Sequence, residues 1–173
     1  MNTEKKRLAT FLLFLVSTAV LVAFDQWTKN LAVEHLKGQE DISLIPGVLC
    51  LHYLENRGAA FGIFQDQRTF LLILTAIILI CVCYVLWRIP SDKKYNLLKL
   101  LCIMITAGGI GNLIDRVRLN YVVDFIYFSL IDFPVFNVAD IYVTTSMFLL
   151  LILVLCYYKK DEDFQFLKWK REK

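Results

Sequence analysis

The stretch that decides the fold is Phe70–Trp87, FLLILTAIILICVCYVLW, which contains no charged residue. It is long enough to cross a lipid bilayer as a helix, because a span needs roughly 17–25 residues. Similar apolar runs cover Leu8–Phe24, Leu97–Ile114 and Ile141–Tyr158. The sequence therefore predicts an all-α polytopic membrane protein with four transmembrane helices.

The composition agrees with this prediction, since 58% of the residues are hydrophobic and the mean hydropathy is +0.57. An ordinary soluble domain has an apolar share of about 45–50%. The first run has one alternative interpretation, because Lys5, Lys6 and Arg7 precede it as they would precede a signal peptide. No small-residue cleavage site follows, and the run stops at the polar segment Asp25–Lys29. We therefore interpret it as a span.

The basic residues predict the orientation. With four spans, both termini lie on one side of the membrane, and that side would hold thirteen of the nineteen Lys and Arg residues. Because Lys and Arg accumulate on cytoplasmic loops, both termini are predicted to be cytoplasmic. The segments 25–69 and 115–140 then lie outside. The net charge of +3 reflects this orientation and does not indicate a nucleic-acid partner.

The outer segment 25–69 contains the clearest signals for further structure. It is expected to begin as an interfacial helix that runs through Lys37. Val48–Leu54 then reads as a strand, because it is rich in β-forming residues and follows Pro and Gly. Gly58 and Gly62 enclose small residues and predict a flexible turn where another backbone can approach. The segment therefore predicts a small outer sheet.

Two acidic residues stand at the outer ends of predicted spans. Asp124 follows the third span and Asp140 precedes the fourth, so the topology brings both carboxyls to the same membrane face. Each has apolar neighbours in the sequence, and ionisable residues at such depth are costly and are functional candidates by default. The alternative interpretation is that each aspartate only caps or anchors a helix.

A pair of carboxyls in contact has a defined chemistry. The two cannot both ionise, so one keeps a proton while the other can act as a base toward water. The base activates water for attack on a peptide carbonyl, and the acid can protonate the oxygen or the leaving amine. Asp124 and Asp140 therefore predict an aspartic peptidase.

Polar residues near the third span are candidates for holding a substrate. Asn112 and Arg116 are four residues apart and share a helix face that can present donors to substrate carbonyls. Arg116 has an alternative role as an interfacial anchor paired with Asp115.

Several other residues have structural interpretations beside functional ones. Gly108 and Gly111 favour close helix packing, because small residues recur at a spacing of four. Asp25 and Lys29 are also four apart, which predicts an ion pair within one helix. Asn56 precedes the small residues of the predicted turn and has no such simple explanation.

The cysteines and histidines predict neither a disulfide framework nor a metal site. Of the five cysteines, four lie inside apolar runs and are expected to be core packing residues: Cys81, Cys83, Cys102 and Cys156. His35 and His52 lack the spacing of a zinc-protease helix. We expect no metal and no other cofactor.

Five stretches of the chain, taken in order, carry a family resemblance: Phe24–Lys29, Asn56–Gly62, Gly111–Arg116, Val122–Phe125 and Phe136–Asp140. Their combination with four spans closely resembles the bacterial lipoprotein signal peptidases, also called type II signal peptidases. The resemblance implies a four-helix membrane fold with an extracytoplasmic β-cradle and an interfacial helix. The resemblance covers the chain from about Asp25 to Asp140, and we expect the whole chain, 1–173, to form one membrane-embedded peptidase domain in the bacterial cytoplasmic membrane.

The resemblance further implies a reaction and its residues. An aspartic endopeptidase of this family removes the signal peptide of a diacylglyceryl-modified prolipoprotein by cutting before the lipidated cysteine, with Asp124 and Asp140 as the catalytic pair. Its partners would be such substrates and membrane lipids, and we expect a monomer. The resemblance assigns substrate-binding or site-bracing roles to a larger set: Asp25, Lys29, Asn56, Gly58, Ala59, Gly108, Asn112, Asp115, Arg116, Asn137 and Ala139.

The chain departs from the family pattern in two places. Ile141-Tyr142 stand after Asp140, where small hydroxyl residues are common in the family, and Glu55 occupies a variable position before Asn56. Neither departure involves the aspartate pair, but both affect the expected shape of the pocket.

Two alternatives from other classes remain open at the level of sequence. A small ion-coupled transporter would also need acids within the membrane, although these should lie near the midplane and often in repeated halves. A non-catalytic assembly factor or scaffold would leave the placement of two aspartates at one membrane face unexplained.

Overall fold

The computed structural model describes residues 3–59, 63–158 and 161–167. Within them, four helical stretches are long and apolar enough to cross a membrane. They cover Leu8–Leu36, Arg68–Arg88, Lys93–Leu119 and Val138–Tyr157. The prediction of four membrane-spanning helices is therefore confirmed. The first three helices extend beyond the apolar runs that predicted them, and the fourth begins three residues before its run and ends one residue before the end of it.

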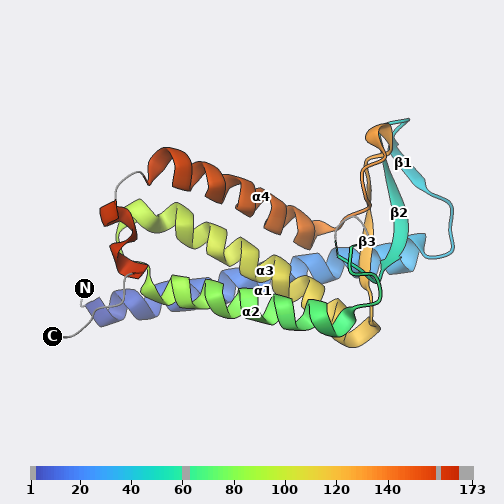
Figure 1. Ribbon diagram of the computed structural model, residues 1–173. Helices are drawn as coiled ribbons and strands as arrows, with labels where there is room; N and C mark the ends of the chain where they lie inside the picture. Colours follow the sequence, from blue (N-terminus) through green and yellow to red (C-terminus); the bar gives the residue numbers. More distant parts are fainter. Residues whose placement is uncertain (1–2, 60–62, 159–160, 168–173) are drawn as a thin grey trace.

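The first helix differs most from expectation. Helix α1 (Thr3–Leu36) is continuous, so residues 25–36 prolong the first span and do not form a separate interfacial helix. Figure 1 shows α1 as one rod that passes the sheet. The reason is local, because the sequence has no Gly or Pro until Gly38, which has a φ of +73° and follows the end of the helix.

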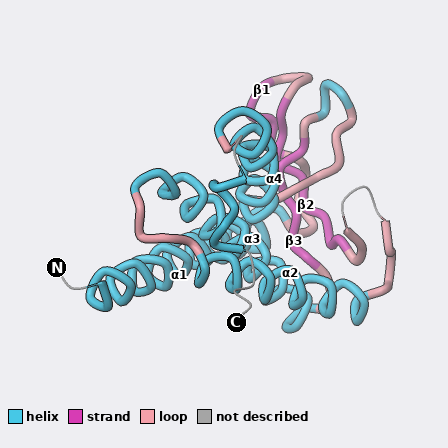
Figure 2. The backbone as a smooth tube through the Cα atoms, turned by 60° about the vertical axis from the view of Figure 1, so that its left-hand side comes forward, coloured by secondary structure: helices cyan, strands magenta, loops and turns pink. Residues whose placement is uncertain are grey.

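A three-stranded antiparallel sheet stands across one end of the helices (Figures 1 and 2), which we call the sheet end. Its strands are β1 (Ile42–Ile45), β2 (Leu49–Asn56) and β3 (Val122–Tyr127), with β2 in the centre. The prediction of a small sheet is confirmed, and the strand expected at Val48–Leu54 is β2. The sheet rests on α1 through an apolar cluster that contains Ala32, Leu36, Val123 and Phe125.

Helix α3 (Asn96–Leu119) is the centre of the bundle, since it packs against α1, α2 (Arg68–Arg88) and α4 (Val138–Ile152). Small residues allow this. A Cβ on Gly108 would lie 2.5 Å from the Ala139 carbonyl oxygen of α4, and one on Gly111 would lie 2.5 Å from Asp25 Oδ2 of α1. The predicted packing role of both glycines is confirmed.

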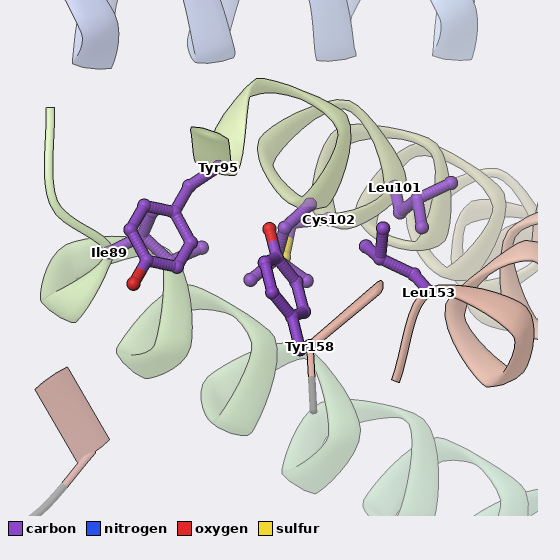
Figure 3. Packing of buried hydrophobic residues seen from close by; sticks show 7 residues of the cluster. Ile89, Tyr95, Leu101, Cys102, Leu153 and Tyr158 are labelled. Carbon is purple, nitrogen blue, oxygen red and sulfur yellow. The ribbon is translucent and has the colours of Figure 1, made fainter. Parts of the chain in front are cut away.

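The opposite end of the bundle is closed by apolar and aromatic side chains. Two short 3₁₀ helices, η2 (Lys93–Tyr95) and η5 (Asp161–Leu167), lie here, and a π-helical turn, η4 (Leu153–Tyr157), continues α4. Figure 3 shows the buried cluster, whose labelled members are Ile89, Tyr95, Leu101, Cys102, Leu153 and Tyr158. An ion pair between Lys94 and Asp163 joins η2 to η5.

All five cysteines are free, but Cys81, Cys83 and Cys156 are exposed, so the prediction that they are core packing residues is wrong for these three. They lie on helix faces that would face lipid, where a thiol needs no partner.

The flexible turn predicted between Gly58 and Gly62 falls partly on residues 60–62, which lie outside the described residues.

Candidate active site

The structure brings the two predicted aspartates to one cleft. Asp124 lies in β3 and is only 1% exposed, while Asp140 lies in the first turn of α4 and is partly buried. Both line a cleft of about 1200 Å³ that runs between the sheet and helices α2, α3 and α4. The two carboxyls come from different elements, so the fold alone creates their proximity.

Asn137 connects the two carboxyls directly. Its side-chain Nδ2 donates to Asp124 Oδ1 at 2.7 Å, and its backbone N–H donates to Asp140 Oδ2 at 3.2 Å. Asn137 is also the N-cap of α4, because its Oδ1 accepts from the Asp140 backbone N–H at 2.9 Å. One oxygen of Asp140 thus takes part in a capping box, as the structural interpretation of this residue expected.

Each carboxyl has a second amide donor. Asn56, at the end of β2, donates to Asp124 Oδ2 at 2.8 Å, and Asn112 of α3 donates to Asp140 Oδ1 at 2.7 Å. Asn56 is itself fixed, since its Oδ1 accepts from the Gly58 N–H at 2.9 Å. Capping therefore accounts for only one of the four carboxylate oxygens, and neutral amides hold the others.

The protonation of Asp124 departs strongly from that of an exposed aspartate. The pKa of Asp124 is raised to about 7, chiefly by burial and secondly by the nearby charge of Asp140. The hydrogen bonds from Asn56 and Asn137 and the charge of Lys29 act in the opposite direction. A carboxyl in this environment can hold or release a proton near neutral pH.

Behind the cleft, Lys29 forms a buried ionic cluster. Its Nζ lies 3.1 Å from Asp25 Oδ2 on the same helix and 2.9 Å from Asp115 Oδ2 on α3. It also donates to Asn112 Oδ1 at 2.8 Å. All three charged side chains are at most 4% exposed. The predicted pair within α1 is confirmed, and the structure adds a partner from a second helix.

The two carboxylates of this cluster hold the backbone next to the aspartates. Asp25 Oδ1 accepts from the Ala139 N–H at 2.9 Å, immediately before Asp140. Asp115 Oδ2 accepts from the Val123 N–H at 3.1 Å, immediately before Asp124. Through these bonds, Lys29 is linked to both segments that carry the pair.

Arg116 makes a different contact from the one considered at the level of sequence. Its guanidinium donates to the Gly58 carbonyl oxygen at 2.9 Å, while Asp115 pairs with Lys29. Arg68 of α2 donates to the Arg116 carbonyl oxygen at 2.8 Å and so holds the end of α3. Arg116 therefore ties α3 to the turn that follows Asn56.

The remaining predicted residues fall into two groups. Five line the cleft with the aspartates: Asn56, Ala59, Gly108, Asn112 and Arg116. The others lie behind them: Asp25, Lys29, Gly58, Asp115, Asn137 and Ala139. No predicted residue lies away from this region of the molecule.

One member of the network was not predicted. Gln26 donates to Asp115 Oδ1 at 2.9 Å and to the Gly111 carbonyl oxygen at 3.2 Å. Gln26 lies between Asp25 and Lys29, in a stretch that carries the family resemblance, and this position could have indicated its role in the network.

Among the described residues, no group of three His, Cys, Asp or Glu side chains is placed to hold a metal ion. His52 lies at the rim of the cleft, where its Nδ1 is 2.7 Å from Asp41 Oδ1. The metal-independent chemistry expected from the sequence stays a prediction.

Together, the fold and the cleft define a class of protein: a multi-pass membrane protein with two carboxyls in one cleft at the end of its helix bundle. Comparison with known proteins narrows this class. Residues 17–156 match the family model described as signal peptidase (SPase) II, so the chain belongs to the signal peptidase II family.

Relatives of known sequence and structure support this assignment to the family. The chain is 41% identical over 151 residues to a lipoprotein signal peptidase of Streptococcus pyogenes serotype M5 (strain Manfredo), covering 87% of this chain and 95% of the relative. The serotype M1 protein of the same name is 42% identical over the same length. A bacterial membrane enzyme solved by the in meso method at 2.3 Å is similar with a TM-score of 0.74 and 33% identity, covering 86% of this chain and 92% of that one.

Proposed function

We propose that this protein is an aspartic endopeptidase that removes the signal peptide of diacylglyceryl-modified prolipoproteins, cutting before the lipidated cysteine. The observation that carries the proposal is the convergence of Asp124 and Asp140 on one cleft, with Asn137 bonded to both. Family membership supports the reaction, and the relatives that the chain resembles are lipoprotein signal peptidases.

The chemistry follows from one shared proton. In the reactive form one carboxyl of the pair is ionised and the other is protonated, because like charges in a desolvated site do not both persist. The ionised carboxyl takes a proton from water as the water oxygen bonds to the peptide carbonyl carbon. The protonated carboxyl gives its proton to the carbonyl oxygen. The C–N bond then breaks as the carboxyl that took the proton from water gives it to the leaving amine, while a hydroxyl on the carbonyl carbon returns its proton to the other carboxyl.

The surrounding amides have a defined part in this mechanism. Asn56 and Asn112 each donate to one carboxyl and so hold its oxygens toward the cleft. The Arg116 guanidinium lines the same cleft, where it can donate to a substrate carbonyl. The buried Lys29 cluster keeps the two aspartate-bearing segments at a fixed spacing, so these residues position the reaction without touching the substrate.

The cleft suits a lipidated substrate. Its walls toward the bundle include Ile78 and Leu79 of α2, Ile105 of α3 and Val143 of α4. This apolar wall can hold part of a signal helix and acyl chains, and each buried methylene adds about 0.8 kcal/mol of affinity. Thus the reacting bond would lie at the polar end of a cleft whose other end is open to lipid.

We further propose that the whole chain acts as one domain and as a monomer, with both termini in the cytoplasm and the cleft at the outer membrane face. The distribution of Lys and Arg supports this orientation. A cysteine introduced at Gln39 should be labelled by an impermeant thiol reagent in intact cells, whereas one at Ser91 should need permeabilised membranes. The reverse pattern would overturn the orientation.

A transporter explains the site less well. Asp124 lies in a strand outside the helices and Asp140 lies in the first turn of α4, so neither acid is near the middle of a span.

The direct test is cleavage of a purified diacylglyceryl-modified prolipoprotein by the purified protein, with the product identified by mass spectrometry. The account predicts a new N-terminus at the lipidated cysteine. The same precursor without lipid is the matched control and should be cut far more slowly. Equal rates for the two precursors would remove the lipid from the model, and no cleavage of either would overturn the proposed reaction.

A further inference from the structure

The far corner of the sheet exposes an apolar surface that the cleft does not use. This sheet tip consists of β1 and the turn after it, residues 42–48, together with the 3₁₀ helix η3 (Ser129–Ile131). The two parts are joined, because the Leu130 N–H donates to the Val48 carbonyl oxygen at 3.4 Å. All four residues of β1 are exposed, and so are Leu130 and Ile131.

The exposure of the sheet tip is as high as that of a lipid-facing helix. Leu130 and Ile131 are 63% and 66% exposed, compared with 53% and 63% for Met147 and Phe148 of the transmembrane helix α4. No Lys, Arg, Asp or Glu occurs within the sheet tip. Among the described residues, β1 pairs only with β2, so its other edge carries no strand. An exposed apolar edge left in water would invite pairing with another chain.

The position of the sheet tip indicates what covers it. Figure 1 shows it beyond the sheet end of α4, on the same side of the bundle as α4 and displaced sideways from the helices, and Figure 2 shows the same overhang from another direction. Since α4 is long and apolar enough to cross the membrane, lipid at the membrane surface is the occupant that this position favours.

We propose that the sheet tip inserts its Leu and Ile side chains into the lipid leaflet at the sheet end of the bundle. The backbone stays at headgroup depth, because the unpaired edge of β1 still needs water as a hydrogen-bond partner. Apolar side chains can reach the boundary between headgroups and acyl chains from there. The acids that flank the tip in sequence, Asp41 and Asp132, contact His52 and Tyr127. The tip itself contains no Lys or Arg that would draw it to anionic lipid.

The structural consequence concerns the mouth of the cleft. Tyr127, Phe133 and Pro134 are close to η3 in the sequence, and all three line the cleft. Insertion of the tip holds this part of the rim at the level of the lipid surface. The inference concerns membrane contact and does not depend on the proposed peptidase activity.

Depth-dependent fluorescence quenching tests the inference on the full chain in phosphatidylcholine nanodiscs. Trp27, Trp87 and Trp169 are replaced by Phe, and one Trp is introduced at Leu130. The matched control carries its Trp at Gln39, on the exposed loop after α1. Brominated lipid should quench Leu130→Trp several-fold more than Gln39→Trp, and aqueous iodide should show the opposite order. Neither result should change with salt or with added anionic lipid.

Three outcomes would overturn the inference. Iodide quenching of Leu130→Trp equal to that of Gln39→Trp would place the tip in water. Shielding from both quenchers would mean that protein covers the tip. A requirement for anionic lipid would replace apolar insertion by electrostatic attraction. Where the variant without native Trp does not fold, the same quenching is measured as a difference between Leu130→Trp and the wild type.

Discussion

At the sheet end of the bundle, α1, α3 and α4 meet around buried charges and amides, whereas at the opposite end α2, α3 and α4 meet around leucine and tyrosine side chains. The apolar end gains stability from burial and needs no exact partner for any group. The polar end has a different requirement, because every buried charge there must keep its partner. The comparison indicates that one end of the bundle stabilises the fold and the other fixes a geometry for chemistry.

Removal of the buried Lys29 charge should give the largest loss of stability. Lys29→Met leaves Asp25 and Asp115 buried without their cation and should lower the free energy of unfolding by about 3–5 kcal/mol. Lys37→Met is the matched control, since Lys37 pairs with Glu55 on the surface and its loss should have little effect. Unfolding in detergent, followed by circular dichroism, measures both. Equal effects would mean that the buried cluster is not special.

The contribution of the apolar end to stability can be tested separately. Leu101 is 1% exposed, so Leu101→Ala should cost about 2–5 kcal/mol of stability through the cavity it leaves. The kcat/KM of the protein that remains folded should be unchanged. Leu100→Ala, at an exposed neighbouring position, is the control and should alter neither quantity. A loss of turnover in folded Leu101→Ala would contradict the division between the two ends.

The packing of α3 should be sensitive near the cleft. Gly108→Ala brings a methyl group within 2.5 Å of the Ala139 backbone and should cost about 1–3 kcal/mol, with a loss of activity because Asp140 is next in the chain. Gly109→Ala is the matched control, since its methyl group would meet only side chains, of which the flexible end of Leu79 is the nearest at 3.0 Å. Thermal unfolding and cleavage assays on both variants would reveal a reversed order if backbone contact were unimportant.

The smallest expected effect is a shift in pH dependence. The pKa of about 7 for Asp124 predicts that activity falls as the pH rises above neutrality, because the pair then loses its shared proton. Asn56 stabilises the ionised form of Asp124, so Asn56→Ala should raise this pKa and move the alkaline limb to higher pH. The measurement is kcat/KM against pH. A shift to lower pH would contradict this assignment.

Much of the fold was predictable from sequence because the bilayer imposes strong rules on it. Apolar runs such as Phe70–Trp87 and the small residues around Gly108 carry direct physical signals. The length of α1 was not predictable, since the polar residues after Phe24 suggest a break that the backbone does not make. Those polar side chains are buried against α3, so tertiary contacts permit the helix to continue.

The candidate site, like the fold, could be predicted only in part from the sequence. Topology alone brings Asp124 and Asp140 to one end of the bundle, and the resemblance selects their neighbours. The sequence does not reveal that Asp25 and Asp115 bind backbone N–H groups, or that Gln26 joins them, because these contacts depend on the register between helices and strand. Hydrogen bonds to backbone leave no pattern in a single sequence.

The central claim is that Asp124 and Asp140 act as one unit. Its most direct test is the cleavage rate of a lipid-modified precursor by wild type, Asp124→Asn, Asp140→Asn and the double variant, each shown to be folded and to bind substrate. Asn is nearly isosteric and caps a helix about as well as Asp, so a structural role predicts near-normal turnover. The account predicts that each single substitution lowers the rate at least about a thousandfold and that the double variant is little slower than either. Near-normal turnover by either single variant, or losses that multiply in the double variant, would contradict it.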